Sequence, residues 1–400
     1  MTHSLSNEKS RESVEKKLRY ALKRSEVVSS VLRTWTDDFE DFRKDALKSV
    51  GQWATDQDVA YIAAQAYSKC CIQFDRGDGV FKLVDLVDEK NIEKMVSWTL
   101  EELASLPAAY RFDFATPQLH VPAEIRLNDD VTLRSPYSKP WPEFRLPQAT
   151  DGIARILSLG YASYSRQQSA VRDAISKLKV TFQLGNIYGI FIRKRADRNI
   201  NLTGINFSQK DGVQYVYAKR NETSQAIPIS ANLSQYLNEV SIPTTYAAEE
   251  VEKRLHHVKE VMGMMYHQRA EKNIQSIRRA LEWSFDAVID EDETTQFIKT
   301  CIGLEAALTD QVEGMGITEQ LADRCAFLLN KTTEAREDTR RKMRKIYQLR
   351  SKIVHGAVLG LSPEDFKIAE EAKNMLTAIL KVEITGVINW WQDELSKRLN

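Results

Sequence analysis

Apolar residues recur at helical spacing along most of the chain, and this pattern predicts a mainly α-helical protein. They return every three or four positions from Val14 onward, so we expect helices within 9–105. The period changes to two over 110–135, which predicts short strands, with a turn at Asn128-Asp129-Asp130. Helical spacing resumes afterwards, and helices are expected over 150–191.

The pattern also predicts a hairpin and a domain boundary. Alternating apolar residues around the turn signal Asp211-Gly212 indicate a β-hairpin over 203–218. A proline-containing connection, Ser241–Thr245, then precedes continuous helical spacing. We therefore expect an α+β module over 1–245 and an all-helical domain over 246–400, giving a mainly α fold with a smaller β component.

Composition narrows the class of protein. The 400 residues are 42% hydrophobic, which is enough for more than one core, and 56 Lys and Arg balance 56 Asp and Glu. Affinity for a polyanion would therefore have to be local. We expect a cytoplasmic protein with no membrane contact, because no apolar run reaches the roughly 18 residues of a membrane span and the first residues lack a secretory segment. The four cysteines are expected to be free thiols.

Motifs for metals and nucleotides are missing from the sequence. There is no glycine-rich phosphate-binding motif, and the histidines do not combine with Cys or carboxylates at zinc spacing. The histidines are His3, His120, His256, His257, His267 and His355. Any catalysis is therefore expected to proceed without a metal or a cofactor.

One predicted helix, ending near Val354, carries a cation on its apolar face. Arg350 falls in line with the apolar residues of this helix, and a buried charge needs a partner. Gly356 suits the left-handed position after a helix, so His355 lies in the last turn, where the helix dipole favours its charged form. Ser362-Pro363 reads as the start of the next helix.

Arg350 and His355 are the two side-chain types that metal-free RNA cleavage requires. A spacing of five turns them about 140° apart on a straight helix, so one helix does not aim both at a single phosphate. A frayed helix end or a second copy of the motif is needed. A two-fold dimer would bring both pairs together, so we expect a homodimer.

Four segments resemble the Apea-like branch of the HEPN superfamily, over roughly residues 250–400. They are Ile317–Leu329, Lys345–Gly356, Ala280–Trp283 and Gly303–Ala306. The resemblance implies an all-helical, commonly dimeric HEPN bundle. Many HEPN domains are metal-independent endoribonucleases marked by an Arg, four to six residues and a His, and Arg350 and His355 fit with four between them. Ser351 follows the Arg, where Asn, Asp or His is commoner.

The resemblance also implies a mechanism and a biological role. His355 would exchange protons with the 2′-hydroxyl or the leaving 5′-oxygen, and Arg350 would neutralise the phosphate, leaving a 2′,3′-cyclic phosphate. Such a nuclease would be an anti-phage, abortive-infection or toxin effector, controlled by a regulatory protein or a phage trigger. Glu305 and Arg324 also lie on apolar faces. One possibility is that both support the same site. The other is a buried ion pair that only stabilises the helical bundle, in which Glu305 pairs with Arg350 or Arg324.

The helix with the motif is strongly basic. Between Arg336 and Lys352 there are eight Lys or Arg against two acids, so RNA could follow this helix, although a solvated helix face explains the run equally well. The RNA-binding candidates are Arg340, Arg341, Lys342, Arg344, Lys345 and Lys352. Three functions remain open: an endoribonuclease, a non-catalytic HEPN domain that binds RNA or protein, and a structural dimerisation module.

Overall fold

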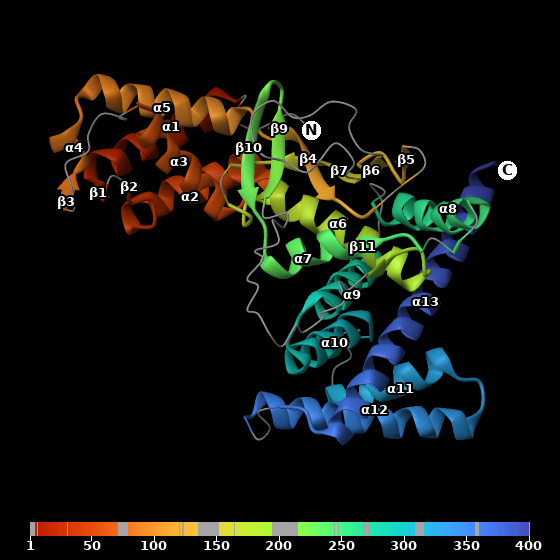
Figure 1. Ribbon diagram of the computed structural model, residues 1–400. Helices are drawn as coiled ribbons and strands as arrows, with labels where there is room; N and C mark the ends of the chain where they lie inside the picture. The colour runs from red at the N-terminus through yellow and green to blue at the C-terminus, as the bar shows by residue number, and fades with distance from the viewer. Residues whose placement is uncertain are drawn as a thin grey trace, which may run out of the picture. The chain divides into compact units, whose positions relative to one another are not determined.

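The chain is mainly helical with a smaller strand content, as the sequence predicts (Figure 1). The computed structural model describes residues 5, 7–29, 31–70, 79–119, 121, 124–134, 152–163, 165–193, 215–243, 245–246, 248–266, 272–308, 316–356 and 360–399.

The chain divides into two compact units that interleave along the sequence. The first comprises Met1–Phe112, Leu157–Ala174 and Tyr217–Pro228, and the second comprises Asp113–Ile156, Ile175–Val216 and Ile229–Asn400. The expected boundary between 245 and 246 therefore differs from this division.

The first unit is built on four helices that share one apolar core. They are α1 (Glu8–Arg24), α2 (Asp37–Val50), α3 (Asp56–Cys70) and α5 (Glu89–Ala104), together with the short α4 (Leu83–Leu86) and a 3-10 turn, Gly51–Trp53. Leu18, Phe39, Phe42, Ile62 and Met95 are fully buried in this core. The Asn7 and Asp88 side chains cap α1 and α5 by accepting backbone N–H groups.

A small antiparallel sheet interrupts the region predicted to be helical over 9–105. Its strands are β1 (Glu26–Val28), β2 (Val31–Leu32) and β3 (Val80–Lys82), in the order β2-β1-β3. The helical interpretation was wrong here because Val28, Val31 and Leu32 fit steps of three and four as well as they fit strands. Pairing between strands shows that the segment is extended: Val27 lies opposite Leu32, and both are buried.

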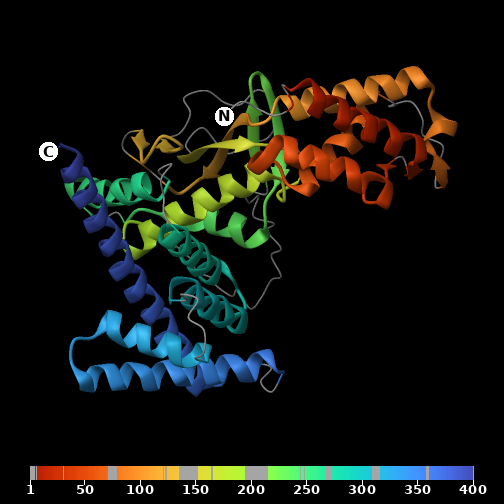
Figure 2. The same cartoon turned by 180° about the vertical axis from the view of Figure 1, so that it is seen from behind.

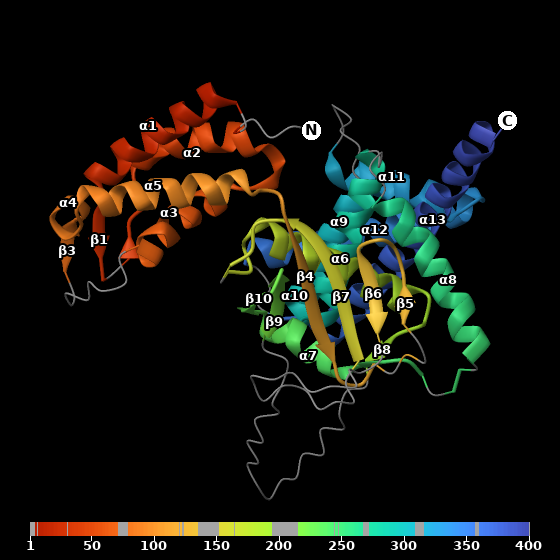
Figure 3. The same cartoon turned by 90° about the horizontal axis from the view of Figure 1, so that it is seen from above.

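A six-stranded sheet has the order β10-β9-β4-β7-β6-β5 (Figure 3). Its strands are β4 (Ala108–Thr116), β5 (Ile125–Arg126), β6 (Val131–Arg134), β7 (Gly152–Gly160), β9 (Tyr215–Arg220) and β10 (Thr223–Pro228). The alternating segment over 110–135 thus contributes β4, β5 and β6. Asn128 forms the turn before β6, because its side chain accepts the N–H groups of Asp130 and Val131.

β7 contradicts the prediction of a helix from 150 onward. Ile153, Ile156, Leu157 and Gly160 imitate helical spacing, yet the segment pairs antiparallel with β6, with Ile156 opposite Val131. In β7 the apolar residues do not mark the buried face, because Leu157 and Leu159 are exposed whereas Ser158 is buried. The helix of this region, α6 (Ser169–Ile187), begins nine residues after the end of β7.

The predicted hairpin over 203–218 is only partly within the described residues. Its turn, Asp211-Gly212, lies outside them. In the described part, β9 pairs with β10 on one side and β4 on the other, and the β9–β10 turn contains Asn221 in the left-handed conformation, with φ 53°. The observed hairpin is therefore Tyr215–Pro228.

The helices of the second unit share a core with α6. Besides α6 they are α7 (Ala231–Glu239), α8 (Ala248–Met265), α9 (Lys272–Ile289), α10 (Glu293–Leu308), α11 (Ile317–Leu329), α12 (Thr333–Val354) and α13 (Pro363–Leu399), and the pair β8 (Ile192–Arg193) and β11 (Val240–Ser241) joins them. Tyr236 of α7 stacks edge-on against Phe182 of α6 and Phe285 of α9. Residues before 245 thus complete the core of the C-terminal helices.

The last five helices form two hairpins and a long closing helix (Figure 2). α9 packs on α10, α11 packs on α12, and α13 contacts all four. Among the described residues, no helix has both the length and the apolar character needed to cross a membrane.

Candidate functional site

Helix α12 carries the Arg350–His355 motif and ends as the sequence predicts. It starts at the N-cap Thr332, whose hydroxyl accepts the N–H of Ala335. It ends at His355, and Gly356 follows with φ 74°, the left-handed conformation expected after a helix end. The Ser362 hydroxyl accepts the N–H of Asp365 and so caps α13.

Arg350 lies at the edge of the buried face of α12, and Glu305 of α10 is its partner. The Nη2 of Arg350 is 3.4 Å from Oε1 of Glu305, and the two side chains are 33% and 23% exposed. Of the two pairings that the sequence left open for Glu305, the structure has the one with Arg350. No described residue accepts a hydrogen bond from Nε of Arg350, although this atom is buried.

Two further polar groups border this ion pair from the core. Tyr347, one turn before Arg350, donates its hydroxyl to the carbonyl oxygen of Cys301 at 3.5 Å. Burial, reinforced by the Glu305 carboxylate, raises the pKa of the Tyr347 hydroxyl and of the Cys301 thiol. Both groups therefore stay neutral beside the Arg350–Glu305 ion pair.

His355 is exposed at the end of α12. Its backbone N–H donates to the carbonyl oxygen of Ser351 at 3.0 Å, and the imidazole forms no hydrogen bond or ion pair with any described residue. Ser351 is exposed too. Because α12 stays helical through Val354, the expected angle of about 140° between Arg350 and His355 applies, and one chain alone does not turn both toward one point.

Arg324 contacts the end of α10 and helix α13. Its Nη1 donates to the carbonyl oxygen of Leu308 at 3.2 Å, and its Nη2 is 3.6 Å from Glu383 of α13. Arg324 thus ties α11 to the end of α10 and to α13. Its described ion pair is with Glu383 and not with Glu305, so its supporting role at the motif stays a prediction.

Half of the predicted RNA-binding cations are engaged by carboxylates of neighbouring helices. These ion pairs are Arg340–Asp323 at 2.6 Å, Arg344–Glu319 at 2.8 Å and Lys342–Glu371 at 2.9 Å. The bond from Arg344 holds the pKa of the Glu319 carboxyl below its ordinary value. Counting charges along α12 alone therefore overestimates the positive charge of this helix, because the balancing acids come from α11 and α13.

The other three candidates are exposed. Arg341 pairs with Asp338 one turn earlier in α12, at 2.6 Å. Lys345 and Lys352 are exposed and have no ion pair with any described residue. These three side chains retain the capacity to bind an anion from solvent.

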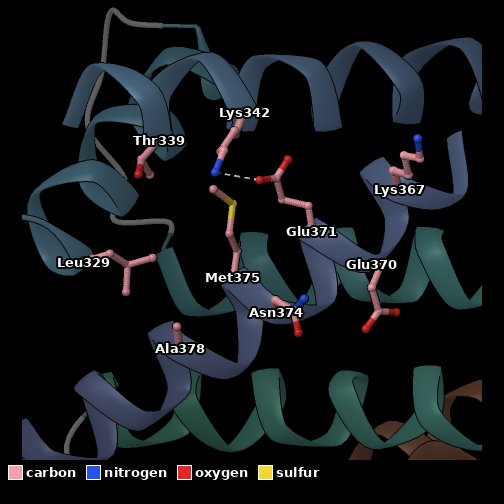
Figure 4. Close-up of a pocket in the computed structure, with 9 residues that line it drawn as sticks. All are labelled: Leu329, Thr339, Lys342, Lys367, Glu370, Glu371, Asn374, Met375 and Ala378. Atoms are coloured by element: carbon pink, nitrogen blue, oxygen red, sulfur yellow. Dashed lines mark ion pairs between the residues drawn. The ribbon is translucent and has the colours of Figure 1, made fainter. Parts of the chain in front are cut away.

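A groove of about 620 Å³ lies between α12 and α13 (Figure 4). Lys342 and Glu371 form an ion pair across it, and neither Arg350 nor His355 is among its lining residues. Its lining is Leu329, Thr339, Lys342, Lys367, Glu370, Glu371, Asn374, Met375 and Ala378. Its lining combines acidic, basic and apolar side chains, which is unlike the cation and imidazole that RNA cleavage by the motif would require.

Within the described part of the chain, no group of three or more His, Cys, Asp or Glu could hold a metal ion. Cys70, Cys301 and Cys325 are free thiols, as expected, and Cys71 lies outside the described residues.

Sequence reasoning missed the acids that balance α12. Glu319 and Asp323 are four apart on α11, so they share one helical face, but only packing shows that this face meets Arg340 and Arg344. Comparison of the chain with protein-family models, with curated proteins and with solved structures finds no match.

Proposed function

We propose that this protein is a metal-independent endoribonuclease of the HEPN type, with the role of an anti-phage or toxin effector. The supporting observation is the different state of the two motif residues on α12: His355 is exposed at the helix end, whereas Arg350 is held near the core by Glu305 with its Nε unpaired. An exposed imidazole can exchange protons with a ligand, and a guanidinium with a spare donor can bind a phosphate oxygen.

The proposed reaction needs only these groups and the RNA. The 2′-oxygen forms a bond to the adjacent phosphorus while the bond from phosphorus to the 5′-oxygen breaks. One imidazole takes the proton of the 2′-hydroxyl, and a second, protonated imidazole gives a proton to the leaving 5′-oxygen. Arg350 stabilises the charge on the non-bridging oxygens, and the products are a 2′,3′-cyclic phosphate and a 5′-hydroxyl.

A two-fold dimer supplies the second imidazole, and it allows Arg350 of one copy to lie beside His355 of the other although the two residues diverge within one helix. Within one helix Arg350 and His355 diverge by about 140°, so a composite site takes residues of two copies around the symmetry axis. A regulatory protein or phage component that controls the effector would act on this assembly. We therefore propose a homodimer in which α12 lies near the axis.

The central experiment is an RNA cleavage assay on the purified protein in the presence of EDTA. Arg350→Ala and His355→Ala are expected to lower the rate at least about 100-fold, because each removes a group that acts in the transition state. His256→Ala is a matched control, since His256 is an exposed histidine of α8. Loss of cleavage on chelation, or full activity in His355→Ala, would overturn the proposal.

Subunit mixing tests the composite site. Arg350→Ala and His355→Ala chains, each inactive alone, are mixed under conditions that allow exchange. If the two copies share a site, some mixed dimers regain an Arg350 and a His355 together, and part of the activity returns. A monomer at working concentration, or mixtures as inactive as the single variants, would exclude the shared site.

A second function is favoured by one observation, the Arg350–Glu305 ion pair itself. An arginine neutralised by a carboxylate of α10 can simply join two helices of a non-catalytic module that binds RNA, binds a protein or dimerises. This alternative expects no cleavage by the wild-type protein under any condition. It also expects Arg350→Ala to unfold or loosen the protein, whereas His355→Ala would leave folding and binding unchanged.

A further inference from the structure

Five polar side chains form a row along the exposed face of α12. They occur at alternating steps of four and three, so at 100° per residue all lie within about 40° of one direction. They are Arg341, Lys345, Gln348, Lys352 and His355, and every one is exposed in the structure. The row thus runs along one face of α12 from Arg341 to the proposed catalytic residue His355.

Three other cations of α12 lie off this row: Arg340 and Lys342 about 100° to either side of its centre, and Arg344 about 60° from it. Arg340 and Arg344 turn to the carboxylates of α11, and Lys342 turns to Glu371 of α13 in the groove of Figure 4. Folding therefore sorts the basic run into two sets. One set joins helices within the protein, and the other faces solvent beside His355.

The charges on the row are available to an anion. Lys345 and Lys352 have no ion pair with a described residue, and Arg341 pairs only with Asp338 of the same helix. That pair is exposed, so it contributes little and a phosphate can replace it. No acidic residue lies between Arg341 and His355 in the sequence. In the next helix, hydrogen bonds from Ser362 and the charge of Lys352 lower the pKa of the Asp365 carboxyl, but Asp365 forms no ion pair with Lys352.

We infer that this row is the binding track for a single-stranded RNA, with backbone phosphates on Arg341, Lys345 and Lys352 and the linkage to be cut at His355. The charge of the row matches a phosphate backbone, and Gln348 offers an amide to a base or a sugar. A flexible single strand lets the 2′-oxygen, the phosphorus and the 5′-oxygen come into line. The position of the cut rests on the proposed function, but the binding track does not.

The length of the row sets the size of the bound segment. His355 lies fourteen positions after Arg341, which is about 21 Å along the helix axis. A stacked strand advances about 3.4 Å per nucleotide, so the track covers about six nucleotides. Affinity is therefore expected to rise with oligonucleotide length up to about six nucleotides and more slowly beyond that.

The test measures binding of a fluorescent 2′-O-methyl oligonucleotide, which lacks the attacking hydroxyl and stays intact. The test variant is Lys345→Gln with Lys352→Gln, and the matched control is Arg340→Gln with Lys342→Gln, which removes the same charge from the same helix at positions about 100° to either side of the row. Loss of two phosphate contacts should make the plot of log binding constant against log salt concentration less steep, by about 1.4 in slope. The control is expected to keep the wild-type slope, and circular dichroism checks that both variants stay helical.

A wild-type slope in the test variant would overturn the inference, and so would an equal reduction in the control, which would indicate bulk charge alone. Wild-type protein that binds no oligonucleotide would overturn it as well. Cleavage is scored separately on ordinary RNA. Salt-dependent binding along the row without any cleavage would support the RNA track and contradict the nuclease. Cleavage that is unchanged by substitution of Lys345 and Lys352 would support the nuclease and contradict the track.

Discussion

Asp58 in the first unit and Arg350 in the second are both charged residues on helices, but the protein satisfies them differently. Asp58 is fully buried, and its carboxylate accepts the N–H of Thr55 at 2.8 Å and of Ser169 at 3.3 Å. It therefore holds the N-termini of α3 and α6 together. Arg350 is one third exposed, has one carboxylate at 3.4 Å and keeps a buried Nε without a described acceptor.

The number of hydrogen bonds that each group receives from the chain distinguishes a charge with a structural role from one that can bind a ligand. A buried charge has to be surrounded by hydrogen bonds, because leaving one unsatisfied costs about 1–3 kcal/mol per group. Asp58 meets this condition within the chain, so no partner is needed. Arg350 meets it only in part, and this spare capacity is what a phosphate or a second subunit can use.

The largest effect that tests this comparison is expected at Asp58. Asp58→Ala removes the acceptor of two partly buried N–H groups, so the free energy of unfolding should fall by about 2–3 kcal/mol in urea titrations. Asp58→Asn keeps one acceptor oxygen and should lose about half as much. A loss below about 0.5 kcal/mol for the alanine variant would show that Asp58 is not the structural group that its hydrogen bonds indicate.

A smaller effect is expected at the Arg350–Glu305 pair. Glu305→Gln removes the charge but keeps the shape, and because the pair is long and partly exposed, the free energy of unfolding should change by less than about 1 kcal/mol. The same urea titration measures it. A loss of 3 kcal/mol or more would be that of a broken buried pair, and would favour the structural module over the nuclease.

The smallest effect concerns pH. Burial raises the pKa of the Asp58 carboxyl above its ordinary value of 3.8, and this outweighs the hydrogen bonds from Thr55 and Ser169 that lower it. The folded state then binds the proton more tightly than the unfolded state. Stability contributed by Asp58 is therefore greatest below 3.8 and declines as the pH rises through the raised value.

The measurement is the difference in unfolding free energy between wild type and Asp58→Asn at several pH values. Carboxyls with a lowered pKa, such as those of Asp290 and Asp365, titrate alike in both proteins and cancel. The difference should decrease from pH 3.8 toward neutrality. A difference that grows over this interval would mean that the hydrogen bonds of Asp58 dominate its burial.

Local signals in the sequence were sufficient for the helix ends around the motif. Gly356 adopts the left-handed conformation and Ser362 caps α13, because these roles depend on a residue's own backbone preference and side chain. The strand β7 was missed since its apolar residues fit helical and extended patterns alike, and only pairing with β6 resolves the choice.

The sequence by itself determined a mainly helical chain, the end of α12 and the presence of a cation on that helix's apolar face. Tertiary structure decided which acid meets each cation. Glu305 reaches Arg350, and Glu319, Asp323 and Glu371 reach the flanks of α12, which leaves Lys345, Lys352 and His355 in solvent. The physical reason is range: caps and spacing act within a few residues, whereas ion pairs form between helices that the sequence does not place side by side.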